Sequence, residues 1–122
     1  MKILKASLFL LAFFVLTAPT YLRANDEMLH DQVMIRTEAG EEFYFNVEMA
    51  LTGGEQARGL MNRSVLEQGS GMLFVFSGEA QRSFWMKDTL IPLDMLFLSH
   101  DGSIHHIHQM AKPQDETQIS SK

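Results

Sequence analysis

The segment 84–94 holds the residues of this chain whose types and spacing could support chemistry. It contains the only tryptophan, Trp85, together with Lys87, Asp88 and Asp94, between apolar runs. A charge close to apolar surface must reach water, pair with an opposite charge or line a site, because burying it alone is costly. Asp94 is the most informative of these charges, since it begins an otherwise apolar run. We therefore expect Asp94 either to be buried with a partner or to line a cleft.

Two arginines precede this segment and could complete a binding site. Arg58 and Arg63 flank the sequence Gly-Leu-Met-Asn, and two guanidinium groups can hold a carboxylate or phosphate through forked hydrogen bonds. The alternative is a structural ion pair between either arginine and Asp94. Trp85 could be a stacking platform for a sugar or an aromatic ligand, or a buried core residue. The predicted ligand-binding residues are Arg58, Arg63, Trp85, Lys87 and Asp94.

Other constellations in the sequence are less complete. Asp88 and Asp94 could be the paired carboxylates of a glycosidase, but Asp88 could equally cap a turn. His106 and His108 would face one side of a strand and could share a zinc or copper ion with a third ligand such as His100. Two ligands do not complete such a site, so a hairpin with histidines on its solvated face is favoured. We predict no metal and no cofactor.

Residues 1–24 have the pattern of a secretory signal peptide. Lys2 and Lys5 precede an apolar run over 8–16 that is too short to span a bilayer comfortably, and Pro19 follows it. We predict cleavage after Ala24; an uncleaved anchor is the alternative. Residues 25–32 are polar and expected to be loose, and 33–122 form a single domain. The expected location is periplasmic or extracellular, without stable membrane insertion after cleavage.

The acidic charge balance bears on the kind of partner. The chain carries 15 acidic and 10 basic residues, a formal net charge of −5, and three of the basic residues lie in the predicted signal peptide. Nucleic acid and anionic membrane surfaces favour basic patches, so neither is an expected partner. The absence of cysteine rules out disulfides and thiolate chemistry. A small polar ligand remains as the expected partner.

The hydrophobic pattern predicts a mainly β protein, an α+β fold with little α. Alternation or apolar runs of strand length occupy 33–37, 42–49, 71–76, 81–86, 93–99 and 103–110. Thr52-Gly-Gly-Glu55 has the spacing of a capping box, which predicts one short helix near 53–61. Gly59 weakens that helix and suits a site where something packs closely. Because the connections have hairpin length, we expect a small curled antiparallel sheet or a barrel.

Four blocks in this order closely resemble one family of small prokaryotic proteins. They read Glu-Gln-Ala-Arg-Gly-Leu-Met over 55–61, Gly-Met-Leu-Phe-Val-Phe over 71–76, Phe-Trp-Met-Lys-Asp-Thr over 84–89, and Ile-Pro-Leu-Asp over 91–94. The chain from about residue 33 onward resembles the family called domain of unknown function 192, whose members are often exported. The resemblance implies a compact, mostly β fold with one short helix, and it implies no activity.

Two departures from the family pattern shape these expectations. The family usually has asparagine where this chain has Asp88, so the resemblance argues against an essential carboxylate there. Family members usually continue with further strands where this chain has its polar last residues, so we expect a truncated or divergent end with an unpaired strand edge.

Three functions follow from these observations. The leading one is an exported module that binds a small polar or anionic ligand at a cleft near 84–94. The first alternative is an enzyme, most plausibly a hydrolase of an envelope saccharide or peptide, which needs an ionisable pair with separated pKa values. The second alternative is a structural or protein-interaction module that uses an exposed edge strand.

Overall fold

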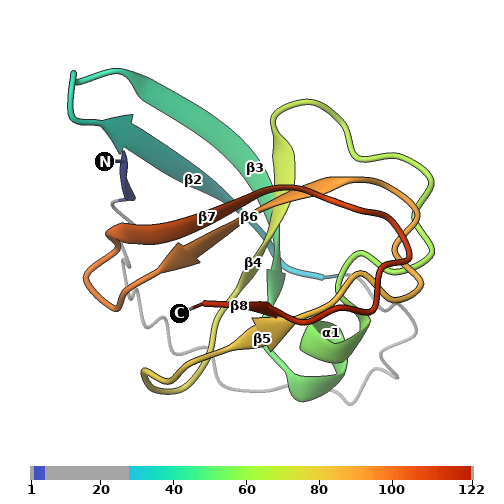
Figure 1. The fold of residues 1–122 in the computed structure, drawn as a ribbon. Helices are drawn as coiled ribbons and strands as arrows, with labels where there is room; N and C mark the ends of the chain where they lie inside the picture. Colours follow the sequence, from blue (N-terminus) through green and yellow to red (C-terminus); the bar gives the residue numbers. More distant parts are fainter. Residues whose placement is uncertain (1, 5–27, 122) are drawn as a thin grey trace, which may run out of the picture.

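The computed structural model describes residues 2–4 and 28–121. Apart from 2–4, the predicted signal peptide lies outside the described residues, as does its cleavage point. His30 to Gln32, expected to be loose, belong to a strand. The elements in chain order (Figure 1) are β1 (Lys2–Leu4), β2 (His30–Thr37), β3 (Glu42–Ala50), α1 (Gly53–Arg58), β4 (Ser70–Phe74), β5 (Ser83–Phe84), β6 (Leu93–Leu98), β7 (Ile104–Ala111) and β8 (Ile119–Ser120).

These strands form small open sheets, which confirms the mainly β class with one short helix. One sheet has the order β1-β2-β3-β4, and β5 with β8 and β6 with β7 form two-stranded pairs. The sheets are not closed into a barrel. The β3–β4 pairing is parallel, from Asn46 opposite Ser70 to Ala50 opposite Phe74, whereas hairpin-length connections had suggested antiparallel pairing throughout. The segment that contains helix α1 returns the chain to the end of the sheet at which β3 began. Strand β4 therefore runs in the same direction as β3.

Helix α1 begins where its local sequence indicates and ends at Arg58, three residues before the predicted end at residue 61. The Thr52 hydroxyl accepts a hydrogen bond from the Glu55 amide at 3.2 Å, and Glu55 Oε2 accepts one from the Thr52 amide at 2.9 Å. This is the predicted capping box. The helix ends at Arg58, and Gly59 follows with φ +48°. A Cβ atom on Gly59 would lie 3.2 Å from the Phe74 ring, which is the predicted close contact.

The hydrophobic core joins the β2–β3 hairpin to the β6–β7 hairpin. Val33, Ile35, Val47 and Ile104 are buried together, and Leu98 and Ile107 pack against them along with Phe45, Met49 and Leu73. Figure 1 shows β6 and β7 crossing over the sheet that β2, β3 and β4 form. The core therefore fills one part of the space between the layers.

Three local features differ from expectation. The strand predicted over 81–86 is limited to Ser83–Phe84, and its partner β8 lies in the polar last residues, where no strand was predicted. Strand β4 is half-buried along its length, where the apolar run suggested burial on both faces.

Within the described part of the chain, no helix has the length and hydropathy to cross a membrane.

Candidate ligand-binding site

The turn after Trp85 is held by backbone contacts to two distant segments. The side chain of Met86 is fully buried, and its amide donates to the Asp115 carbonyl oxygen at 2.8 Å. The Asn62 amide donates to the Asp88 carbonyl oxygen at 2.8 Å, and the buried Thr89 hydroxyl donates to the Lys87 carbonyl oxygen at 3.1 Å. The segment 84–94, whose residue types suggested a functional site, therefore has a large structural role as well.

Asp88 adopts a left-handed backbone conformation of the kind found in turns. Its φ is +52°, in the left-handed region that asparagine and aspartate tolerate better than other non-glycine residues. The Asp88 side chain is exposed. This agrees with the turn interpretation of Asp88.

Arg63 is held in a bidentate ion pair with Glu48 of β3. Nη2 donates to Oε1 at 3.0 Å, and Nη1 donates to Oε2. Both side chains are partly shielded from solvent. This pair fixes the loop after α1 against the sheet, and Arg63 does not line the cavity described below.

Trp85 and Lys87 lie together at the surface. The Lys87 ammonium is 5.2 Å from the centre of the Trp85 ring, and the tryptophan is 46% exposed. Trp85 is therefore not a core residue. It lines the cavity, while Lys87 covers the ring from outside the lining.

Asp94 holds a bulge between β6 and β7. Its Oδ1 accepts a hydrogen bond from the Met110 amide at 2.8 Å, at a register shift between Leu93 and Met95. Met110 has φ +51°. Asp94 is exposed, and Arg63, one of its two expected ion-pair partners, is bound to Glu48. The expected burial of Asp94 is wrong, and the second expectation, a position on a cleft, agrees with its place in the cavity lining.

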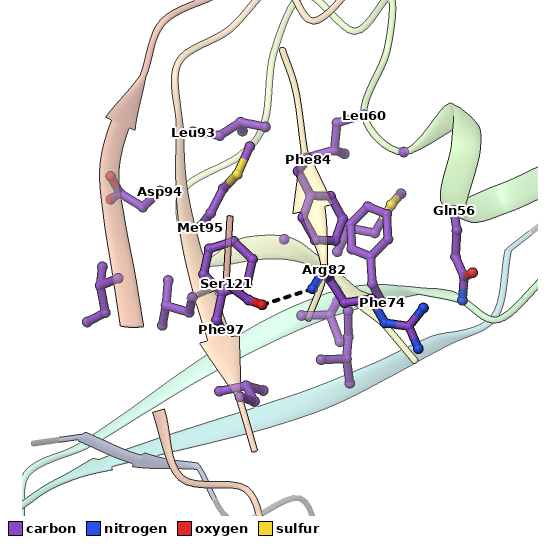
Figure 2. Close-up of a pocket in the computed structure, with 18 of the residues that line it drawn as sticks. Gln56, Leu60, Phe74, Arg82, Phe84, Leu93, Asp94, Met95, Phe97 and Ser121 are labelled. Atoms are coloured by element: carbon purple, nitrogen blue, oxygen red, sulfur yellow. Dashed lines mark hydrogen bonds between the residues drawn. The ribbon is translucent and has the colours of Figure 1, made fainter. Parts of the chain in front are cut away.

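A large cavity lies between the β-sheet layers, and the core residues Val33, Ile35 and Val47 form part of its lining. Its volume is about 1330 Å³. Arg58, Trp85 and Asp94 of the predicted set line it, together with several exposed residues, so it opens to solvent. Figure 2 shows its apolar wall, which includes Leu60, Phe74, Phe84, Leu93, Met95 and Phe97.

Aromatic rings connect the two layers along this wall. Phe84 packs edge-on against Phe74 at 5.3 Å between ring centres and lies 5.8 Å from Phe97. Phe97 in turn stacks on His106 at 5.7 Å. The ring centres of Phe76 and Phe84 are 6.2 Å apart, so Phe76 is a further member of this row of rings. Ring pairs at such separations add to the burial of apolar area, so the wall is both apolar and well ordered.

Two polar residues of the lining escaped the sequence analysis. The Gln56 amide of α1 donates to the Ala50 and Val75 carbonyl oxygens at 3.2 and 2.7 Å, which anchors the helix. Arg82 precedes β5, and its guanidinium carbon lies 4.3 Å from the centre of the Phe76 ring. Arg82 had no motif around it; the aromatic residues on either side, Phe76 and Phe84, were the available signal.

The His105 side chain forms hydrogen bonds, and the His106 ring packs on Phe97. His105 Nε2 lies 2.9 Å from the Ser121 carbonyl oxygen, and its Nδ1 lies 3.4 Å from the Ser99 hydroxyl. Residues 2–4 and 28–121 contain no group of three or more His, Cys, Asp or Glu side chains that could hold a metal ion. Glu42, Tyr44, Asp101 and Asp115 have shifted pKa values, and none of these four lines the cavity.

The fold and the site define a small, mainly β domain with an apolar cavity between its layers. The family model of DUF192, described as Uncharacterized ACR, matches residues 34–122, and the chain belongs to this family. The family assignment made from the four sequence blocks is thus confirmed.

Two solved structures are similar to this chain. A "putative transcription regulator" from Sinorhizobium meliloti 1021 is 36% identical, with a TM-score of 0.78 over 80% of this chain and 76% of that one. A protein of unknown function from Novosphingobium aromaticivorans DSM 12444 is 34% identical, with a TM-score of 0.74 over 85% of this chain and 73% of that one. No curated protein matches this chain.

Proposed function

We propose that this chain is an exported, non-catalytic binding domain for a small molecule with an apolar body. The observation that carries the proposal is the cavity of about 1330 Å³ with its wall of phenylalanine, leucine and methionine side chains. Pockets for small ligands are concave, mostly apolar and equipped with a few polar groups. This cavity has that composition, with Arg58, Arg82 and Asp94 among its polar residues.

The apolar wall changes the expected ligand. The sequence suggested a small polar or anionic molecule near 84–94, but most residues around the cavity are hydrophobic. A purely polar ligand would lose its hydration there without replacing those hydrogen bonds. Burial of a hydrocarbon or aromatic body contributes about 0.8 kcal/mol of binding free energy for each CH₂ group. The apolar body of the ligand therefore supplies more of the affinity than any polar group attached to it.

The carboxylates beside the cavity favour binding over hydrolysis. Asp94 accepts a hydrogen bond from the Met110 amide, and Glu79 lies 3.1 Å from His100 in an exposed pair. A hydrolase needs two ionisable groups that act together on one bond. The commitments of Asp94 and Glu79 to other groups support the binding function.

A series of linear alcohols tests the proposal, because alcohols carry an apolar body without charge. We expect saturable binding of 1-hexanol, 1-octanol and 1-decanol, with affinity rising about fourfold for each added CH₂ group. The fluorescence of Trp85, the single tryptophan, reports occupancy of the cavity that it lines. Binding that is absent, or that does not depend on chain length, would contradict the proposal.

A pair of leucine variants locates the binding. Leu93 lines the cavity, whereas Leu29 is 63% exposed and lies outside the lining. Leu93→Ala should weaken 1-decanol binding about fivefold or more, because contacts in the wall are lost, and Leu29→Ala should leave it unchanged. Equal effects of the two substitutions would mean that the alcohols bind elsewhere.

A further inference from the structure

Arg82 lies on the cavity lining in a position that its backbone holds firmly. The Arg82 amide donates to the Ser121 hydroxyl at 2.9 Å, and the Ser121 amide donates to the Arg82 carbonyl oxygen at 2.8 Å. Ser121 is only 6% exposed. Figure 2 shows the contact to Ser121 at the base of the arginine, with the side chain running on beside Phe74. The base of the side chain is therefore fixed, which lowers the entropic cost of binding through it.

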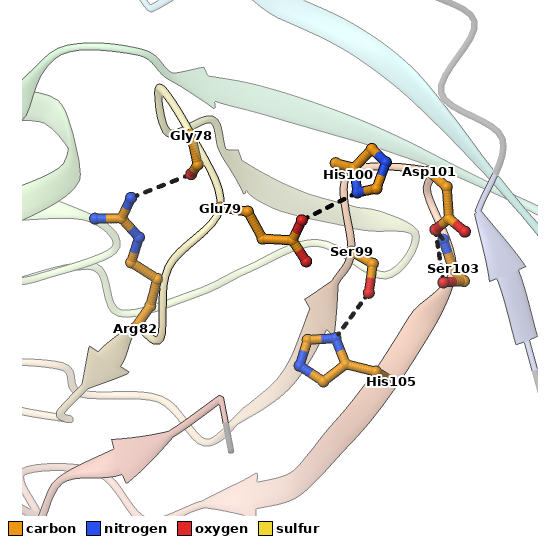
Figure 3. A network of polar contacts seen from close by, with 8 residues as sticks. All are labelled: Gly78, Glu79, Arg82, Ser99, His100, Asp101, Ser103 and His105. Carbon is orange, nitrogen blue, oxygen red and sulfur yellow. Dashed lines mark hydrogen bonds and ion pairs between the residues drawn. The ribbon is translucent and has the colours of Figure 1, made fainter.

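The guanidinium group of Arg82 has capacity for a further partner. Within the described part of the chain its one hydrogen bond, from Nη2 to the Gly78 carbonyl oxygen, is 3.4 Å long, and a guanidinium carries five N–H donors. Among residues 2–4 and 28–121, no carboxylate forms an ion pair with it. The nearby Glu79 points to His100 instead (Figure 3), at 3.1 Å. A half-buried cation is thus left at the edge of an apolar cavity.

The ring of Phe76 gives this cation a defined orientation. The guanidinium carbon lies 4.3 Å from the ring centre, where the aromatic face attracts a cation. A guanidinium stacked in this way still presents its N–H groups at its edge, and the forked edge matches the two oxygens of a carboxylate. The cavity beside it would accept the apolar part of the same molecule.

We propose that Arg82 binds the carboxylate head of an amphipathic anion whose hydrocarbon body occupies the cavity, so that Arg82 determines the ligand class. This inference rests on the proposed function, since it assigns a head group to the ligand of the same site. The site therefore distinguishes a fatty or aromatic carboxylate from its neutral analogue. Arg82 acts in ligand selection only, and no bond is made or broken.

Decanoate and 1-decanol at pH 8 form the matched pair of probes, since they share a chain length and differ in charge. Arg82→Gln should weaken decanoate binding about tenfold or more and change 1-decanol binding less than twofold. Arg82→Lys should give an intermediate loss for decanoate, because it keeps the charge and lacks the fork. Added salt should weaken decanoate binding to the unsubstituted chain more than 1-decanol binding.

Arg36→Gln is the control for charge, because Arg36 is paired with Glu42 and does not line the cavity. It should leave both affinities unchanged. The inference is overturned if Arg82→Gln leaves decanoate binding intact, or if it weakens both probes equally, which would indicate a structural role. If neither probe binds the unsubstituted chain, the proposed function itself fails; 1-decanol binding with no effect of Arg82 on decanoate overturns only the present inference.

Discussion

The Asn62 amide donates a hydrogen bond to the Asp88 carbonyl oxygen at 2.8 Å, and both residues have positive φ, +61° and +52°. Two left-handed residues from separate turns thus meet through their backbones. Asp88 lies within the sequence block 84–89, and Asn62 directly follows the block 55–61. The contact joins the loop after α1 to the turn after Trp85, and so positions two parts of the cavity lining.

The left-handed conformation of Asp88 predicts how substitutions there will behave. Asp88→Asn and Asp88→Gly should retain the stability of the unsubstituted chain or increase it, because both residues tolerate positive φ. Asp88→Val should lower the free energy of unfolding by about 1–2 kcal/mol, since a β-branched residue is strained there. Urea unfolding measures the three values. A valine variant as stable as the asparagine variant would contradict the turn interpretation.

Gly59, which follows α1, offers a second stability test, and the first turn of that helix supplies two control positions. Gly59→Ala should cost about 1–3 kcal/mol, because φ is +48° and the new methyl group would lie 3.2 Å from the Phe74 ring. Gly53 and Gly54 have open space around the Cβ position. Alanine at either position should be neutral or slightly stabilising. Thermal unfolding of the three variants gives the comparison, and a similar loss in all of them would refute the role of the Phe74 contact.

Asp94 should matter for stability as a hydrogen-bond acceptor, not as a charge. Asp94→Asn keeps a side-chain oxygen for the Met110 amide and should change the free energy of unfolding by less than about 0.5 kcal/mol. Asp94→Leu removes the acceptor and should cost about 0.5–1.5 kcal/mol. Amide hydrogen exchange at Met110 should speed up in the leucine variant only. Faster exchange in both variants would show that the negative charge is required.

Stability should fall at both ends of the pH range, for opposite reasons. The pKa values of Asp101 and Asp115 lie below the ordinary 3.8, chiefly through side-chain hydrogen bonds from Ser103 and Thr117. The pKa of Glu42 is lowered chiefly by the Tyr44 hydroxyl. A lowered pKa contributes stability that is present above the unfolded value and is lost as pH falls through the folded value. Thermal unfolding should therefore move to lower temperature in acid below about pH 4.

The alkaline side depends on Tyr44, whose pKa is raised from 10.0 chiefly by its hydrogen bond to Glu42. This contribution is present below the unfolded pKa and is lost as pH rises through the folded one. Glu42→Gln should return the pKa of Tyr44 toward 10.0, as measured by ultraviolet titration. Ser103→Ala should likewise move the pKa of Asp101 toward 3.8 in NMR titrations, without affecting Tyr44. If Tyr44 titrates identically with and without Glu42, the assigned cause is wrong.

The features that the sequence predicted are those set by neighbouring residues. Thr52 and Glu55 specify the start of α1 within a single turn, and Asp88 occupies a turn with φ +52°. Both follow from local chemistry. The family was likewise readable, because its blocks are short and ordered.

The features that escaped prediction depend on residues far apart in the chain. Arg82 gains its position from Ser121, 39 residues away, and Arg63 finds its partner Glu48, 15 residues away. No spacing rule links such pairs. The choice between the two alternatives for Asp94 stayed open for a related reason, since the bulge that exposes it exists only when β6 meets β7. The parallel β3–β4 pairing was not predicted, because α1 is short. The segment that contains it resembles a connection between antiparallel strands.

That parallel pairing also bears on how quickly the chain folds. Asn46 meets Ser70 only after the intervening segment has closed into a loop, and closing a loop costs entropy before any contact compensates for it. Helix α1 shortens the flexible part of that loop, and its start is specified locally by Thr52. The cap at Thr52 then influences the rate at which the central sheet assembles as well as its final stability. We therefore expect removal of the Thr52 hydroxyl to slow the pairing of β3 with β4 as well as to lower the free energy of unfolding.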